Sequence, residues 1–323
     1  MKEDEREVAV CYQPSSEWQA QLSAGYSELS RAIAEDDVGR FHFFLANFGT
    51  WREYLGVDSI LIQHCRDSVP GRRFLQNDLL DKEVRWWQRL YNNRKSISSL
   101  SQPQHGNLAG GYIEGAFVGF GSVFDELHGS VFSGLLDDVA HPVVAELGAG
   151  FGRLAYFILR EVGRFTYIDF DLPETLCLAA YYLMLYFPAK RVLLYGEAPY
   201  SPSVHRSYDL IFMPSYEISK VGSLSVDLFL NKNSLGEMTK AAVDQYVTEM
   251  CRATHRYLFH TNHDATPNIY TNGQRGPLGY EYPIPQEQFR LLFRYPDLSQ
   301  VIGLGWFDRS SDTVMYLYQR RIE

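Results

Sequence analysis

The sequence predicts an α/β fold in which a mostly parallel sheet carries helices on both faces and follows a helical N-terminal region. From residue 143 onward, short apolar runs alternate with longer segments whose apolar residues recur with a helical period, as in strands joined by crossover helices. Residues 1–104 show helical periods without a strand pattern of comparable strength. We therefore divide the chain into a helical cap or oligomerisation region, residues 1–104, and an α/β domain, residues 105–323.

Composition limits the functions that the chain can have. The 323 residues carry a net charge of -9 at pH 7 without any long basic run, which argues against nucleic acid as a partner. Four scattered cysteines without a C-x-x-C pair favour a reduced, cytoplasmic protein, and they do not support a zinc site. We expect neither a membrane span nor a signal peptide, because no apolar run approaches about 18 residues and the N-terminus is highly charged.

The N-terminal region reads as a layer of helices. Residues 1–13 show no periodic pattern and are expected to be frayed. The periodicity predicts helices over residues 15–35, 38–48 and 79–91, with a further candidate over 60–65. A Ser-rich and then Gly-rich linker or exposed loop follows over residues 96–111. This helical layer is a candidate dimer surface.

The α/β domain alternates predicted strands and helices. Strands are expected over residues 143–145, 165–171, 191–196, 208–215, 226–231 and 256–260, with the last strands near 289–293 and 314–318. Helices are expected after Gly152 and over residues 176–187 and 238–254. Residues 271–285 are rich in Gly, Pro and Tyr, which indicates a loop over the site.

A glycine-rich turn joins the first strand of this domain to its helix, with the sequence Glu146-Leu-Gly148-Ala149-Gly150-Phe-Gly152. Glycines at alternate positions permit a tight turn and let a ligand approach bare backbone N–H groups. The dinucleotide fingerprint G-x-G-x-x-G would need a glycine where Arg153 stands, which disfavours a nicotinamide-dependent oxidoreductase. The pattern instead resembles the first motif of class I S-adenosylmethionine (SAM) methyltransferases. That resemblance implies that Glu146 lies near the cationic methionine end of the cofactor.

A carboxylate follows the second predicted strand of the domain. Asp171 lies 23 residues beyond Gly148, close to the spacing of about 20 at which an acidic residue meets ribose hydroxyls in such a crevice. A carboxylate can accept hydrogen bonds from both hydroxyls. Asp171 also precedes Pro173 and could cap the next helix, and Asp169 is the competing ribose ligand.

Three motifs occur in order: the glycine-rich turn, Asp171-Leu-Pro-Glu174, and Asn233-Ser234-Leu-Gly-Glu237-Met238. Over about residues 105–300 this set resembles the sugar O-methyltransferase family of bacterial polysaccharide and glycoside biosynthesis. Phe170-Asp171-Leu-Pro173 is also similar to the plant phenolic O-methyltransferases, in which that Asp binds the ribose, and this favours Asp171 over Asp169. The resemblance implies a Rossmann-like class I methyltransferase sheet with SAM as cofactor. The cofactor contacts would come from Glu146, Gly148, Ala149, Gly150, Gly152, Asp171, Leu172, Pro214, Ser215 and Asn231.

Polar residues at the ends of two later strands are candidates for the general base. A sugar hydroxyl is a poor nucleophile at neutral pH, so a base that takes its proton should assist methyl transfer. Our candidates are His263 or His260, with Asp264 orienting the imidazole, and Glu237 as the alternative base. A metal is not expected, because this cluster lacks a second carboxylate.

The sequence thus predicts a cytoplasmic SAM-dependent O-methyltransferase that acts on a sugar or a glycosylated small molecule. An alternative acceptor is a phenolic or amine small molecule, which the 22 Tyr, 20 Phe and 5 Trp residues favour. Another alternative is a non-catalytic scaffold subunit that keeps the fold, although the glycine-rich turn and Asp171 are both intact. The sequence leaves open which sugar and which hydroxyl are modified, and whether the acceptor is free, nucleotide-linked or part of a polymer.

Overall fold

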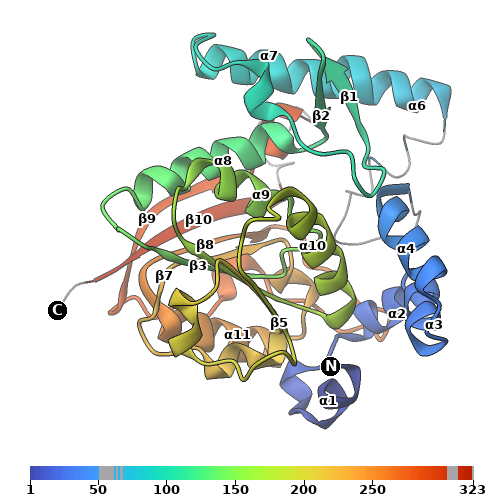
Figure 1. Ribbon diagram of the computed structural model, residues 1–323. Coiled ribbons are helices and arrows are strands. Elements are labelled where there is room, and N and C mark those ends of the chain that lie inside the picture. Colours follow the sequence, from blue (N-terminus) through green and yellow to red (C-terminus); the bar gives the residue numbers. More distant parts are fainter. Residues whose placement is uncertain (51–61, 63–64, 66–67, 304–311, 322–323) are drawn as a thin grey trace.

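A computed structural model describes residues 1–50, 62, 65, 68–303 and 312–321, with an eight-stranded sheet at its centre (Figure 1). The strand order is β5-β6-β4-β3-β7-β8-β10-β9. The neighbouring strands from β5 to β8 pair in parallel, whereas β10 is antiparallel to both of its neighbours. The strands are β3 (Val143–Leu147), β4 (Thr166–Asp171), β5 (Val192–Leu194), β6 (Leu210–Pro214), β7 (Val226–Lys232), β8 (Thr254–His263), β9 (Phe289–Pro296) and β10 (Thr313–Arg320).

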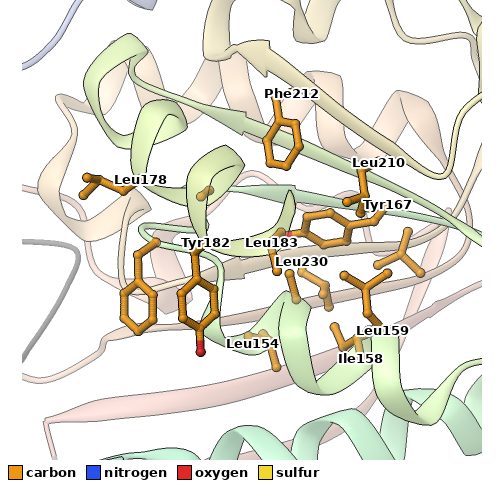
Figure 2. Close-up of a cluster of buried hydrophobic side chains, with 14 of the residues drawn as sticks. Leu154, Ile158, Leu159, Tyr167, Leu178, Tyr182, Leu183, Leu210, Phe212 and Leu230 are labelled. Atoms are coloured by element: carbon orange, nitrogen blue, oxygen red, sulfur yellow. The ribbon is translucent and has the colours of Figure 1, made fainter. Parts of the chain in front are cut away.

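Helices cover both faces of this sheet (Figure 1). On one face lie α8 (Ser122–Leu135), α9 (Arg153–Glu161) and α10 (Pro173–Tyr186), and on the other lies α11 (Lys240–Ala253). Apolar side chains of α9 and α10 pack against those of the sheet strands, as Figure 2 shows for Leu154, Ile158, Leu159, Leu178, Tyr182, Leu183, Tyr167, Leu210, Phe212 and Leu230. The predicted Rossmann-like α/β fold is confirmed by this arrangement.

The order of the strands determines where a ligand can bind. From β3 the chain first builds the sheet outward through β4 and β6, and it later returns to the other side of β3 with β7 and β8. In open α/β sheets, ligands bind outside the carboxyl ends of the strands at such a point of reversal. The site is therefore expected above the ends of β3, β4 and β7.

The N-terminal region is helical, as predicted, with helices α1 (Lys2–Glu7), α2 (Ser16–Ala24), α3 (Ser27–Ala34), α4 (Val38–Asn47), α6 (Val69–Arg73) and α7 (Asp81–Leu90). The single helix expected over 15–35 is interrupted between α2 and α3, at the helix-weakening Gly25 and the fully buried Tyr26. Most of the candidate helix over 60–65 lies outside the described residues. Within the described parts of the chain, no helix is long and apolar enough to cross a membrane.

A hairpin that the sequence did not predict lies between the two regions. It joins β1 (Gly110–Ile113) to β2 (Ala116–Gly119) through Glu114 and Gly115, which both have positive φ angles, as two-residue hairpin turns require. One hydrophobic cluster combines side chains of α7 and the segment before it, such as Leu80 and Trp87, with Val118 of β2 and Phe124 of α8. The division at residue 104 stays a prediction, and this cluster crosses it.

Candidate cofactor and catalytic site

The glycine-rich turn after β3 has a backbone that only glycine adopts easily. Gly148, Gly150 and Gly152 have φ angles of 81°, 63° and 84°. The N–H of Gly148 donates to the carbonyl of Phe170 at 2.8 Å, which ties the turn to the end of β4. A Cβ atom on Gly148 would lie 2.3 Å from Oγ of Ser234, so this position accepts no side chain without rearrangement.

Asp171 lies at the end of β4 and supports this turn from the side. Its Oδ2 accepts the N–H of Gly150 at 2.9 Å, and its Oδ1 accepts the N–H of Leu172 at 2.7 Å. Burial raises the pKa of Asp171 to about 6, although hydrogen bonds from Thr175 and these two N–H groups oppose the shift. A carboxylate has about four acceptor positions, so Asp171 can still accept hydroxyl groups from the crevice.

The competing residue, Asp169, lies two residues earlier on the same face of β4. Its side chain is fully buried. Burial, reinforced by the neighbouring Asp171, raises the pKa of Asp169 well above its ordinary value. A neutral carboxyl group sealed in the interior is poorly placed to meet a ribose, so the geometry favours Asp171.

Glu146 also faces inward. It is 2% exposed, and its Oε2 accepts the hydroxyl of Tyr167 at 2.5 Å. Burial raises the pKa of Glu146 to about 7, against the effect of that hydrogen bond. In this conformation Glu146 would act on a bound cation through its field rather than by direct contact, and its predicted role stays a prediction.

A cavity of about 50 Å³ opens between the glycine-rich turn and Asp171. It is lined by four residues of the predicted cofactor set, Gly148, Asp171, Leu172 and Ser215. Pro214 pairs with Asp171 in the sheet directly behind this lining. The remaining walls are largely apolar and aromatic, and are formed by Leu147, Phe170, Ser234, Met238, Ala242, Tyr246, Tyr12, Gln13, Pro14, Ser15 and Trp18.

Five of these wall residues, Tyr12, Gln13, Pro14, Ser15 and Trp18, come from the N-terminal segment. The first part of this segment, residues 1–13, was expected to be frayed. That expectation is wrong. Residues Lys2–Glu7 form α1, and Val10–Tyr12 form a 3-10 turn that packs against α11. No periodic pattern marks this packing in the sequence, because the segment contributes single side chains rather than one face of a long helix.

Asn231, at the end of β7, holds the loop that follows it. Its Nδ2 donates to the carbonyl of Leu147 at 2.8 Å, and its Oδ1 accepts Nδ2 of Asn262 at 2.8 Å. The Oδ1 of Asn262 in turn accepts the N–H of Gly236 at 3.0 Å. Because Asn231 is fully buried, it positions the loop containing Ser234 and Gly236 beside the glycine-rich turn.

Glu237 ends this loop and is a strong candidate for a general base. Its Oε2 accepts the indole N–H of Trp18 at 2.8 Å. Burial raises the pKa of Glu237 to about 7, helped by the negative charges of Asp171 and Glu17 and opposed by the hydrogen bond from Trp18. A carboxyl group with a pKa near the working pH is well suited to accept a proton and to release it.

His263 is the second candidate base at the same edge of the sheet. Its Nδ1 hydrogen-bonds with Oδ2 of Asp312, and the other oxygen of Asp312 accepts the N–H of Thr266 at 2.7 Å. His263 is partly exposed, and it lies against Gly236 in the loop that carries Glu237. A carboxylate behind one ring nitrogen fixes the imidazole and leaves the other nitrogen available.

The expected partner of this histidine, Asp264, is engaged elsewhere. Its carboxylate accepts hydrogen bonds from Arg294, from the hydroxyl of Tyr316 at 2.7 Å and from the N–H of Tyr280 at 3.1 Å. The structure therefore contradicts the prediction that Asp264 orients the imidazole. Sequence reasoning missed Asp312, because it enters only through the antiparallel pairing of β10 with β8.

His260 is poorly placed to act as a base. It is 1% exposed, and its ring stacks on that of Tyr316 with centroids 4.6 Å apart. Burial lowers the pKa of His260 to about 3. The ring is therefore a neutral member of the core, and the assignment of His260 as a base is corrected. Among the residues that the structure describes, no group of three or more His, Cys, Asp or Glu side chains could hold a metal ion.

Comparison with known proteins gives fold similarity alone. No family model and no curated protein matches the chain, so the resemblance to sugar O-methyltransferases stays a prediction. Similar solved structures include the [4+2]-cyclase SpnF (TM-score 0.42, 12% identity, 61% of this chain and 81% of that chain covered). The mitomycin 7-O-methyltransferase MmcR is similar with a TM-score of 0.37 and 11% identity over 62% of this chain and 55% of that chain. An S-adenosylmethionine-dependent methyltransferase from Mesorhizobium loti is similar with a TM-score of 0.39 and 12% identity over 59% of this chain and 96% of that chain.

Proposed function

We propose that this chain is a SAM-dependent methyltransferase that methylates a hydroxyl group of a sugar or a glycosylated small molecule. One observation carries the proposal. Gly148, Asp171, Leu172 and Ser215 were assigned to the cofactor from three separate segments of the sequence, and they line a single cavity at the point where the strand order reverses.

The chemistry of the cavity fits a nucleoside with a positively charged tail. Apolar and aromatic walls suit a flat base, and Asp171 offers acceptor positions for ribose hydroxyls. The carboxyl groups of Glu146 and Asp171 lie at the turn, and the negative charge of Asp171 adds to burial in raising the pKa of Glu146. Negative charge at this turn disfavours the pyrophosphate of a dinucleotide and favours a sulfonium and an ammonium. When bound, SAM supplies an electrophilic methyl group.

The residues of the chain must then position the acceptor and remove its proton. Methyl transfer is an in-line displacement, so rate depends on holding the acceptor oxygen in line with the methyl group. Glu237 is our first choice for the base because its raised pKa matches this task, and its carboxylate would accept the hydroxyl proton. His263, fixed by Asp312, is the alternative on the same edge.

A second, larger hollow next to the crevice supports a sugar as the acceptor. It has a volume of about 730 Å³ and shares Gln13 and Pro14 with the lining of the cofactor cavity. Its lining includes many residues with hydroxyl, amide or charged groups, which are the hydrogen-bonding partners that a sugar needs: Glu5, Arg6, Gln13, Gln19, Ser23, Ser27, Ser30 and Glu174. The aromatic residues that favoured a phenolic acceptor serve largely in the hydrophobic core, as Tyr26, Tyr167 and Tyr182 do.

The proposal is tested by a transfer assay with methyl-labelled SAM and a panel of free sugars, nucleotide sugars, glycosides and phenols. We expect label in a sugar-containing acceptor, and a loss of turnover of about 100-fold or more in whichever of Glu237→Gln and His263→Asn removes the base. If both variants turned over as fast as the unmodified chain, the base assignment would be refuted. Label in phenols alone would overturn the sugar assignment, and SAM binding without transfer to any acceptor would favour the scaffold alternative.

A further inference from the structure

The outer wall of the cofactor cavity comes from residues 10–18, which we call the N-terminal strap. The strap runs from the 3-10 turn Val10–Tyr12 to the first turn of α2. Ser15 caps α2 by accepting the N–H of Trp18 at 3.3 Å, which fixes the position of Trp18 in the first turn of this helix. Tyr12 and Trp18 thereby both reach the cavity lining from one short segment.

Side chains hold the strap against the site. The ring of Tyr12 meets that of Tyr246 edge to face with centroids 5.3 Å apart, and its hydroxyl accepts Nε2 of Gln245 at 3.0 Å. Trp18 donates to Glu237, the candidate base. Tyr246 donates in turn to Oγ of Ser215, another residue of the cavity lining, at 2.9 Å. The strap thus touches both the cofactor cavity and the catalytic edge.

The backbone contacts of the strap are local in the described part of the chain. The N–H of Tyr12 donates to the carbonyl of Ala9 at 2.9 Å, and that of Gln13 donates to the carbonyl of Val10 at 3.1 Å. A segment held by a few side-chain hydrogen bonds and ring contacts, rather than by a β ladder, opens at low cost in free energy.

The size of the cofactor cavity indicates that the strap must move before a cofactor can bind. The closed cavity measures about 50 Å³, whereas sites for ligands of drug size measure roughly 300–1,000 Å³. SAM belongs to this size class, so the cavity must widen to hold it. The cavity lining nevertheless suits a purine, because Tyr12, Trp18 and Tyr246 contribute aromatic rings to it.

We propose that the N-terminal strap is a movable wall of the cofactor site, which opens to admit the ligand and closes Tyr12 and Trp18 over its heteroaromatic end. This proposal rests on the proposed function and adds two cofactor-binding residues that no sequence motif marks. Because Trp18 donates to Glu237, opening of the strap would also break a hydrogen bond to the candidate base.

The test compares binding of SAM, S-adenosylhomocysteine and adenosine to the full chain and to Tyr12→Ala and Trp18→Ala by calorimetry. We expect both variants to weaken adenosine and SAM by similar factors, at least about fivefold, as loss of base–aromatic stacking does. Tyr295→Ala is the matched control, because Tyr295 is exposed on the edge strand β9, outside the cavity lining, and should leave affinity within about twofold. Hydrogen exchange of residues 8–18 should slow when SAM binds.

Unchanged affinity in both strap variants, with unchanged exchange of residues 8–18, would overturn the strap proposal and leave the proposed function standing. Tighter binding in the variants would also overturn it, since the strap would then compete with the ligand for the crevice. If the full chain binds neither SAM nor adenosine, the proposed function fails and the strap proposal fails with it.

Discussion

Replacing Asp171 by Asn tests the ribose contact with little change in shape. Both carboxylate oxygens already accept a backbone N–H group, at 2.9 Å and 2.7 Å. Asn offers one acceptor oxygen and turns an NH2 group toward the other N–H, so one charged acceptor is lost. A hydrogen bond to a charged group contributes about 1.5–3 kcal/mol. At about 1.4 kcal/mol per factor of ten, SAM affinity should fall about tenfold to hundredfold.

Calorimetry at pH 8, where Asp171 is ionised, measures this loss directly. Because the pKa of Asp171 is about 6, the affinity of the unmodified chain should also fall as the pH drops below 6. This fall should be smaller in Asp171→Asn, where only the protonation of Glu146, with a pKa of about 7, remains. Asp169→Asn is the matched control, since Asn imitates the neutral buried acid and should bind SAM within about threefold. Full SAM affinity in Asp171→Asn, or a selective loss in Asp169→Asn, would refute the assignment.

Three further substitutions test other parts of the account. Gly148→Ala should destabilise the fold by about 1–3 kcal/mol in thermal unfolding and weaken SAM binding, because φ is 81° and the new Cβ would lie 2.3 Å from Oγ of Ser234. Burial raises the pKa of Glu83 from 4.5 to about 8, so the stability linked to its proton is present below pH 4.5 and lost as the pH rises to 8. Glu83→Gln should therefore gain stability relative to the unmodified chain between pH 5 and 8, by up to about 5 kcal/mol, and the exposed Glu287→Gln should not. His260→Phe should keep turnover within about threefold, and a larger loss would restore His260 as a catalytic candidate.

Local patterns in the sequence were enough to predict the sheet and the floor of the site. The turn from Gly148 to Gly152 and the carboxylate of Asp171 each follow a strand directly, so chain direction and strand order bring them together. The predicted strands from residue 143 onward are present, including the two that complete the sheet near the C-terminus. These features depend on short stretches of chain whose chemistry is readable without knowing the tertiary structure.

The rest of the site depends on contacts between distant segments. Asp312 reaches His263 because Thr313 pairs with His263 across two antiparallel strands, and no local pattern marks that pairing. The inward orientation of His260 follows from the aromatic rings that pack around it, which a strand-end position alone does not reveal. Trp18 lies within the helix predicted over residues 15–35, but its hydrogen bond to Glu237 joins residues 219 positions apart in the sequence.

Thermal unfolding of the full chain with SAM, S-adenosylhomocysteine or NAD tests the central claim most directly. A ligand that binds only the folded state at about a hundred times its Kd adds about 2.7 kcal/mol of stability. We predict that SAM and S-adenosylhomocysteine raise the midpoint by a few degrees and that NAD leaves it unchanged. No shift with either SAM-type ligand, or a shift with NAD alone, would contradict the assignment of this crevice to SAM.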